Sequence, residues 1–407
     1  MRSEWREVKL KDVLLEKGYI RGPFGSALRR GELLNSGPIP VYEQMHAIDG
    51  IRDFRYYIDD AKYESLKRFT VRSGDLIVSC SGTVGCISTI KPDDPIGIVS
   101  QALLILRADP RIILPEYLRY YLTSPEGQHA IISRSSGSVQ VNIARKAVII
   151  AIDFLLPPLE IQKAIVDTMS CLDAKIELNN KINENLEAQA QAVFKSWFVD
   201  FEPFQNGEFV DSELGLIPEG WHVAALPEYI DVTYGAAYQS KYFNESGEGM
   251  PLIRIRDLKT RSPQVYTTQI LPNQTVVEPG DLIAGMDAEF APYIWTGQAA
   301  LMNQRVCMFR YGHSIVNNLY TYFLIKPHLE YIQFYKTGTT VSHLGKRDID
   351  AIKILVPPRS AILEYCGLVE HQLLLMIAGQ KQNMVLSILR NTLLPKLMSG
   401  EIEVPVD

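Results

Sequence analysis

Two pairs of adjacent basic residues occupy matching positions in the chain and could bind phosphate groups. Arg145-Lys146 and Lys346-Arg347 each lie shortly before a Pro-Pro dipeptide, and each follows a polar segment, residues 135–142 and 337–343. Lysine and arginine bind phosphate oxygens, while hydroxyl, amide and imidazole groups contact phosphates and base edges. The pattern indicates a nucleic-acid interface, although an adjacent basic pair can also be an ordinary solvated surface.

Other polar side chains of the two halves could read base edges. Arg, Asn, Gln and His hydrogen-bond to bases in the major groove, and a good bidentate contact contributes about 1–3 kcal/mol of discrimination. Gln101 and Gln304 stand at similar positions in the two halves and could equally be structural amides. The predicted DNA-binding residues are Arg29, Arg30, Gln44, His46, Gln101, Gln140, Asn142, Arg145, Lys146, Arg254, Arg256, Lys259, Arg261, Asn303, Gln304, His343, Lys346 and Arg347.

Catalytic patterns are absent from the sequence. It contains no G-x-x-x-x-G-K-[ST] phosphate loop and no G-x-G-x-x-G after a strand. The seven histidines do not fall at metal-ligand spacing, and the five cysteines form no C-x-x-C pair. Asp287 and Glu289 could form an acid pair, but no general base accompanies them. We therefore predict that the chain is not itself an enzyme and binds no metal or cofactor.

The elements that would position these residues occur twice. Trp5–Leu10 matches Trp221–Leu226, Ser73–Ile77 matches Pro279–Ile283, and the Pro-Pro of 157–158 matches that of 357–358. The offset between the copies shrinks from 216 to 200 residues, as expected for a diverged tandem repeat.

Each copy begins with short β-like runs and a few helical stretches, which predict an α+β domain. The predicted strands are 75–80, 99–106, 252–256 and 305–309, and the predicted helical stretches include 116–122 and 319–324. The domains are residues 1–158 and 205–358, and a long helical segment follows each of them, at 159–204 and 359–407. The predicted fold is therefore two α+β domains separated by a long antiparallel coiled coil, with an internal pseudo-twofold repeat.

Both helical segments carry apolar residues at alternating gaps of four and three, the period of a coiled-coil seam. An amide interrupts each seam near its middle, and such a buried amide fixes the register of two helices. A helix of about 40 residues spans roughly 60 Å, so packing of each helix on its own domain is the less economical alternative. The predicted seam residues are Ile165, Met169, Leu172, Ile176, Asn179, Asn183, Leu186, Val193, Val369, Leu373, Met376, Gln380, Asn383 and Leu386.

The net charge of −6 argues at first against nucleic acid as a partner. Its distribution changes that inference. Residues 1–158 carry 21 basic and 18 acidic groups, while residues 159–204 carry 4 and 8, and residues 205–358 carry 12 and 16. The acidity is thus concentrated in the first long helix and the second domain, and the second domain remains the weaker candidate for DNA binding.

The order of these motifs resembles the specificity subunit of type I restriction-modification systems. Gly22–Ser26 followed by Gly37–Val41, and Gly280–Asp287 followed by Asn303–Cys307, look like openings of target recognition domains. Leu156–Gln162, Phe194–Phe204 and Leu394–Ile402 are similar to helical-region signatures of the family, whereas the second Pro-Pro runs into Arg359-Ser-Ala-Ile362 and departs from that pattern.

The resemblance implies a non-catalytic reader of double-stranded DNA. Each domain would contact one half of a split target, with the coiled coil setting the gap. Two methylation subunits would dock on the helices and use S-adenosylmethionine, and two restriction subunits would use ATP and Mg²⁺.

Two other interpretations compete with the DNA reader. One is a coiled-coil scaffold or adaptor without DNA contacts, and the other is a fragment of a fused restriction-methylation enzyme. The odd number of cysteines, the lack of a signal peptide and the lack of an 18-residue apolar run predict a cytoplasmic protein without a membrane partner.

Overall fold

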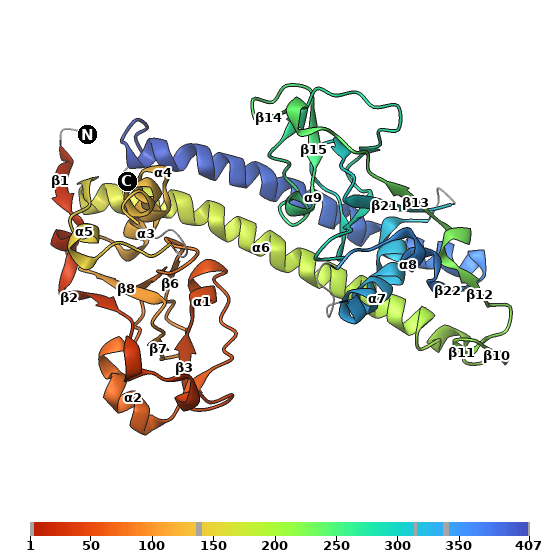
Figure 1. The fold of residues 1–407 in the computed structure, drawn as a ribbon, viewed down its shortest axis with the longest axis horizontal. Helices are drawn as coiled ribbons and strands as arrows, with labels where there is room; N and C mark the ends of the chain where they lie inside the picture. The colour runs from red at the N-terminus through yellow and green to blue at the C-terminus, as the bar shows by residue number, and fades with distance from the viewer. Residues whose placement is uncertain (1–3, 136–140, 313–315, 337–341, 406–407) are drawn as a thin grey trace. The chain divides into compact units, whose positions relative to one another are not determined.

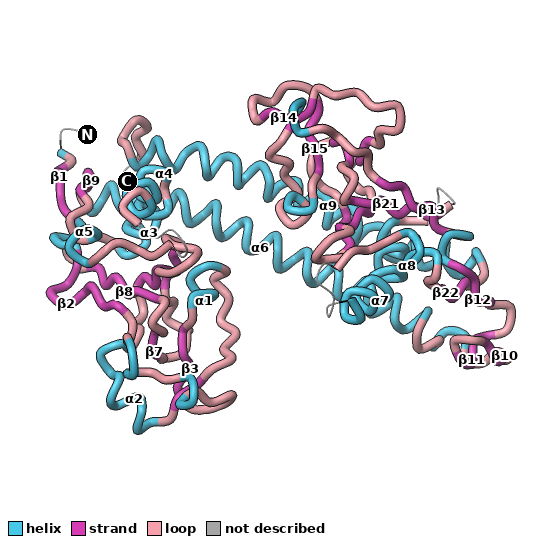
Figure 2. The backbone as a smooth tube through the Cα atoms, viewed as in Figure 1, coloured by secondary structure: helices cyan, strands magenta, loops and turns pink. Residues whose placement is uncertain are grey.

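The computed structural model describes residues 4–135, 141–312, 316–336 and 342–405 (Figure 1). The chain divides into two compact units, of which the first contains residues 1–174 and 387–407 and the second contains residues 175–386. Each unit combines an α+β domain with parts of two long helices (Figure 2), which confirms the predicted fold class.

The first unit is built on an antiparallel sheet with the strand order β2-β8-β5-β6. A second sheet has the order β4-β3-β7, and β1 pairs with β9. The strands are β1 Arg6–Lys9, β2 Leu14–Arg21, β3 Ile39–Tyr42, β4 Tyr57–Ile58, β5 Leu76–Ser79, β6 Ile87–Thr89, β7 Ile98–Val99, β8 Leu103–Ala108 and β9 Asp153–Leu156. The helices are α1 Gln44–Ile48, α2 Asp60–Leu66, α3 Pro115–Thr123, α4 Pro125–Ile132 and α5 Lys146–Ile149.

Strands β5 and β8 are continuous apolar runs because both of their faces are buried. Successive side chains of a strand point to opposite faces. Ile77 and Ile105 pack with β3 and β7, whereas Leu76 and Leu106 pack with α3. The predicted strand 99–106 is in fact two strands, β7 and β8, because residues 100–102 form a turn between them.

The second unit repeats this architecture. Its main sheet has the order β13-β21-β18-β19, its second sheet β14-β16-β15-β20-β17, and β12 pairs with β22. The strands are β10 Phe209–Ser212, β11 Gly215–Pro218, β12 His222–Ala225, β13 Ile230–Tyr234, β14 Phe243–Asn244, β15 Met250–Ile253, β16 Tyr266–Thr267, β17 Val276–Val277, β18 Leu282–Gly285, β19 Pro292–Ile294, β20 Ala300–Met302, β21 Val306–Tyr311 and β22 Lys353–Val356. The helices are α7 Asn318–Lys336 and α8 Lys346–Asp350.

The internal repeat is confirmed strand by strand. In each unit one strand of the second sheet pairs antiparallel with one neighbour and parallel with another, as β3 does with β4 and β7 and β15 does with β16 and β20. The pair α3–α4 corresponds to the single helix α7. Ser124 and Pro125 separate α3 from α4, because the Ser124 hydroxyl caps α4 and accepts a hydrogen bond from the N–H of Gly127.

The two long helices, α6 Leu159–Phe198 and α9 Arg359–Met398, each begin directly after a Pro-Pro. α6 ends at Phe198, six residues before the end of the predicted segment at 204. The chain leaves the helix because Phe201 adopts a left-handed conformation with φ of 56°, and residues 202–204 form a separate short 3-10 helix.

The helices pair antiparallel within each unit. In the second unit the side-chain N–H of Asn179 donates to Asn383 and to Gln382, both at 2.8 Å, and the Tyr365 hydroxyl donates to the carbonyl of Ala190. In the first unit Arg390 contacts Asp173 at 3.1 Å. The predicted seam residues are all buried or half-buried, and two of the four predicted amides, Asn179 and Asn383, bond to each other.

Helix α9 is long and apolar enough to cross a membrane by length and composition alone, although its sequence has no uninterrupted run of 18 apolar residues. A helix that packs inside a protein passes the same test. In this structure 39% of that apolar window is buried, including Val369 and Met376 on the seam. Packing against α6 therefore accounts for part of the apolar composition of α9, while Leu374, Leu375 and Val385 of the same helix are exposed.

Candidate DNA interface

Three backbone segments meet beside the central strand β5 in the first unit. The N–H of Cys80 donates to the carbonyl of Ala102 at 2.9 Å, and the N–H of Ile143 donates to the carbonyl of Cys80 at 3.0 Å. Ser81 and Asn142 form an isolated β-bridge, and the Ser81 hydroxyl donates to the amide oxygen of Asn142 at 2.8 Å. The predicted residues Gln101 and Asn142 are thus brought together on adjacent segments.

The second unit assembles the same three segments beside β18. The N–H of Met286 donates to the carbonyl of Arg305 at 2.9 Å, and the N–H of Leu344 donates to the carbonyl of Met286 at 2.7 Å. Asp287 and His343 form the corresponding isolated bridge. Predicted residues Gln304 and His343 therefore occupy the positions that Gln101 and Asn142 hold in the first unit.

A glycine directly after β2, and another directly after β13, allows the chain to approach this arrangement closely in each unit. A Cβ added to Gly22 would lie 1.9 Å from the carbonyl oxygen of Ser100, and one added to Gly235 would lie 2.0 Å from that of Asn303. No side chain fits at such a distance, so glycine is required for the close backbone contact. The glycine that opens the Gly22–Ser26 motif thus has a structural reason.

The side chains at the bridge of the second unit form a polar cluster. His343 Nδ1 lies 2.6 Å from Asp287 Oδ1, and Arg305 Nε lies 3.2 Å from Asp287 Oδ2. The Arg305 side chain is 52% exposed and that of His343 is 45% exposed, whereas that of Asp287 is 25% exposed. The side chains of Arg305 and His343 are therefore exposed to solvent while both contact the Asp287 carboxylate.

Each basic pair lies at the beginning of a short helix that follows the bridge. Arg145 and Lys146 open α5, Lys346 and Arg347 open α8, and all four side chains belong to exposed residues. Lys346 and Arg347 make no ion pair with the described part of the chain. The four cations are consequently available to phosphate groups.

Helix α8 is fixed to the end of α7 through Asp348. The Asp348 carboxylate accepts hydrogen bonds from the N–H of Gly345 at 2.7 Å and from Lys336 Nζ at 2.6 Å. Burial is the largest single influence and acts to raise the pKa of Asp348, but these two hydrogen bonds together with the charge interactions of Lys336 and His343 lower the pKa below its ordinary value. The ionised carboxylate therefore holds the N-terminus of α8, and with it the basic pair.

His46 is a structural histidine, which corrects its prediction as a base reader. It is fully buried, its Nδ1 accepts from the N–H of Glu43 at 2.7 Å, and its Nε2 lies 2.9 Å from the carbonyl of Asp53. Its ring also stacks on Phe54. No ring nitrogen is left for a base edge.

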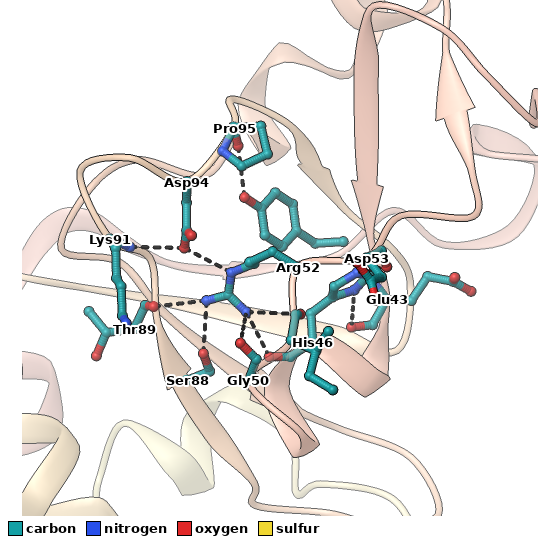
Figure 3. Close-up of polar contacts among 12 residues, drawn as sticks. Glu43, His46, Gly50, Arg52, Asp53, Ser88, Thr89, Lys91, Asp94 and Pro95 are labelled. Atoms are coloured by element: carbon teal, nitrogen blue, oxygen red, sulfur yellow. Dashed lines mark hydrogen bonds and ion pairs between the residues drawn. The ribbon is translucent and has the colours of Figure 1, made fainter. Parts of the chain in front are cut away.

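Arg52 lies in the loop that follows α1, the helix that contains His46 (Figure 3). Its guanidinium contacts Asp94 at 2.8 Å, the Ser88 hydroxyl at 2.9 Å and the carbonyls of Thr89 and His46. Helix α1 also carries Gln44, whose amide N–H donates to the carbonyls of Ser81 and Thr83. Gln44 therefore supports the bridge segment from within the domain, and its side-chain donors are occupied there.

Several predicted residues of the second domain are also held by internal contacts. Arg254 pairs with the buried carboxylate of Asp257 at 3.3 Å, and Lys259 pairs with Glu289 at 3.1 Å. Arg261 is half-buried, and this burial lowers the pKa of its guanidinium. The side-chain oxygen of Asn303 accepts from the N–H of Gln304. These residues shape the domain surface, and their contacts compete with any contact to DNA.

Exposure separates the remaining predictions. Gln140 lies outside the described residues. The predicted residues that are exposed and make no ion pair within the described ranges are Arg29, Arg30, Gln101, Arg145, Lys146, Arg256, Gln304, Lys346 and Arg347. Asn142 is exposed as well and bonds to Ser81. Sequence reasoning missed Arg305, Asp287 and Ser81 as interface residues. The one available signal was the position of Arg305 directly after Gln304, in the segment that matches 101–102.

Buried thiols in the two domains are not reactive groups. Burial raises the pKa of Cys80 to about 12 and that of Cys307 to about 12, so both thiols stay neutral. Over the described ranges, no three His, Cys, Asp or Glu side chains come together as ligands for a metal ion. The exposed polar groups of the two domains are hydrogen-bond donors and basic side chains, which are suited to contacts with bases and phosphates.

Comparison with known proteins identifies the family. The sequence profile of the type I restriction modification DNA specificity domain matches residues 2–188 and 218–364, one match for each half. The chain belongs to this family. The resemblance found in the motifs is thereby confirmed, and the two matches fall on the two repeats.

Individual specificity subunits extend the comparison. The type I restriction enzyme MjaIX specificity subunit of Methanocaldococcus jannaschii is 29% identical over 309 residues, which cover 72% of this chain and 70% of that protein. The HindI specificity subunit of Haemophilus influenzae is 22% identical over 98% of this chain and 100% of its own length. The crystal structure of the S subunit of a type I restriction-modification system from M. genitalium covers 97% of this chain with a TM-score of 0.53 at 15% identity, which shows a shared fold.

Specificity subunits recognise DNA targets, and this family assignment does not support a scaffold without DNA recognition. Specificity subunits are generally non-catalytic. For this specificity subunit, the three-segment arrangement in each repeat is the place where exposed donors and cations gather.

Proposed function

We propose that this specificity subunit reads a bipartite target in double-stranded DNA, with one half-site for each α+β domain. The recognition domains are residues 1–158 and 205–358, and residues 159–204 and 359–407 are the helical spacers. The observation that carries the proposal is the duplication of one backbone arrangement, since the segments at Ser81 and Asn142 recur at Asp287 and His343. Two domains with the same backbone arrangement are suited to a DNA target that has two half-sites.

The exposed lysine and arginine side chains give each domain a means of binding the DNA backbone. Arg145 and Lys146 in the first domain correspond to Lys346 and Arg347 in the second, and each pair directly follows a bridge segment. Phosphate contacts fix orientation on the duplex, while neighbouring side chains read bases. The basic pairs would thus contact phosphates, and the neighbouring bridge residues would read bases.

We propose that the long helices bind two methylation subunits, which use S-adenosylmethionine. Two restriction subunits, which use ATP and Mg²⁺, would complete the complex. Type I specificity subunits act with methylation and restriction subunits in general. In the second unit, Leu178 and Ile182 on α6 and Leu374, Leu375 and Val385 on α9 are exposed apolar side chains. Apolar surface of this kind is typical of a protein interface. A cytoplasmic location follows from such partners and from DNA as the target.

Fluorescence anisotropy tests the DNA-binding part of the proposal. The full chain, alone and with the methylation subunit of its own system, is titrated into a labelled duplex of random sequence. Binding in at least one state is expected, with a strong dependence on salt concentration. The absence of binding in both states would refute the proposal.

Co-purification tests the docking part. The substitution Leu375→Glu places a charge in the apolar surface of α9 and is expected to abolish co-purification of the methylation subunit. Ile270→Glu is the matched control, since Ile270 is 85% exposed and lies outside the long helices. Equal recovery of the methylation subunit with both variants would place the docking surface elsewhere.

A further inference from the structure

The two domains share one backbone arrangement but carry different side chains at three positions of its adjoining segments. Ser81, Ala102 and Asn142 in the first domain correspond to Asp287, Arg305 and His343 in the second. The correspondence is fixed by hydrogen bonds, because Cys80 and Met286 bond the neighbouring segments in the same way. Only the side chains change between the copies.

A shared backbone arrangement with different side chains is what two domains need in order to recognise different DNA sequences. The frame needs glycine at 22 and 235 and main-chain bonds that do not depend on side-chain type. Side chains that leave such a frame can vary without loss of the fold. Discrimination between bases depends on side-chain donors and acceptors, so variation at these positions alters the sequence that is read.

Resting on the proposed function, we propose that these three positions determine which bases each domain reads, and that Arg305 contacts a guanine in the major groove. Arginine donating to the O6 and N7 acceptors of guanine is the commonest specific contact of this kind. Arg305 is exposed and lies next to Gln304, and its Nη2 makes no hydrogen bond to the described part of the chain. It therefore retains donors for a base.

Asp287 and His343 act as positioning residues for Arg305. Asp287 contacts the guanidinium through both oxygens, at 3.2 Å to Nε and 3.3 Å to Nη1, and His343 Nδ1 lies 3.4 Å from Nη1. A long flexible side chain loses less conformational freedom on binding when it is held in place beforehand. In the first domain Ala102 provides no such donor, and the amide of Asn142, held by Ser81, is the corresponding group.

The test measures sequence preference with the full chain and its methylation subunit. A pool of duplexes with randomised base pairs is bound, and the bound fraction is sequenced for the wild type, Arg305→Ala and Asp287→Asn. Arg305→Ala is expected to lower the preference for guanine at one position of one half-site by about 5- to 150-fold, leaving the other half-site unchanged. Asp287→Asn is expected to weaken the preference at that same position. Lys346→Ala, which removes a charge from the same domain, is expected to leave the preferred sequence unchanged.

The outcomes separate this inference from the proposed function. If wild-type complex binds no duplex in the pool, the proposed function fails. If it binds a defined sequence and Arg305→Ala, still folded by circular dichroism, binds that same sequence with undiminished preference, the inference fails while the proposed function stands. A uniform loss of affinity for all duplexes would make Arg305 a phosphate contact and would also overturn the inference.

Discussion

The basic pair of the second domain offers a quantitative test of the phosphate contacts. Lys346→Ala combined with Arg347→Ala removes two exposed cations that make no ion pair with the residues the structure describes. Each phosphate contact contributes about −0.9 to the slope of log affinity against log salt concentration. If both side chains contact phosphates, the slope becomes shallower by about 1.8.

The change is large enough to measure by anisotropy. Between 50 and 200 mM salt, a slope difference of about 1.8 means that the wild type loses about 12-fold more affinity than the double variant. The loss should be the same for specific and random duplexes, since phosphate contacts carry no sequence information. The fold should be unaffected because both side chains are exposed.

The control removes the same charge from ion pairs of the second unit. Lys195 pairs with Asp200 and Arg310 pairs with Asp281. Arg310 is also five residues along β21 from Arg305, roughly 16 Å away in an extended strand. Lys195→Ala combined with Arg310→Ala should therefore keep the wild-type slope. An unchanged slope in the Lys346 and Arg347 variant, or an equal change in the control, would refute the assignment of the basic pair to phosphates.

Three further substitutions test the frame that supports the interface. Gly22→Ala should destabilise the first domain by more than about 2 kcal/mol in urea unfolding, because its Cβ would meet a backbone carbonyl at 1.9 Å; Gly31→Ala, with open space around it, should change stability by less than about 0.5 kcal/mol. Arg52→Ala leaves a nearly buried carboxylate unpaired and should cost about 3–5 kcal/mol, whereas Lys67→Ala breaks an exposed pair and should cost less than about 1 kcal/mol; equal costs would contradict the role of Arg52. The lowered pKa of Asp348 contributes stability above its unfolded-state pKa of about 4, and this is lost as pH falls through the lower folded-state pKa; Asp348→Asn should flatten that acid dependence, and an unaltered pH profile would contradict the role of its hydrogen bonds.

Features that depend on repeated patterns could be predicted from the sequence. The spacing of apolar residues over two 40-residue helices carries many independent observations, and Asn179 and Asn383 stand at the buried seam that this spacing indicates. The internal repeat was visible because several anchors recur in order. These signals are averages over many residues, so individual substitutions do not erase them.

The role of single polar residues could not be predicted in the same way. His46 and Gln101 are both polar residues predicted to read bases, yet His46 is buried between Glu43 and Asp53 while Gln101 is exposed on a turn. The contacts of Arg305 join it to residues 18 and 38 positions away in sequence. Such partners are set by tertiary packing, which leaves no local periodic signal.

Net charge was a weak guide for the same reason. The second domain is acidic in sum, but Asp257, Asp281 and Asp348 are engaged with internal bases or backbone N–H groups. Lys346 and Arg347 remain exposed in the same domain. Local exposure of charge, rather than its total over the domain, therefore decides whether a phosphate can be held.

The most direct test of two-domain DNA reading is a map of methylated adenine. The chain is co-expressed with its methylation subunit in a host without adenine methylation, and methyladenine is located across the genome for the wild type and for Arg305→Ala. The account predicts one bipartite sequence with two specified blocks, of which only one changes in the variant. Methylation at a single undivided sequence, or a change in both blocks together, would contradict it.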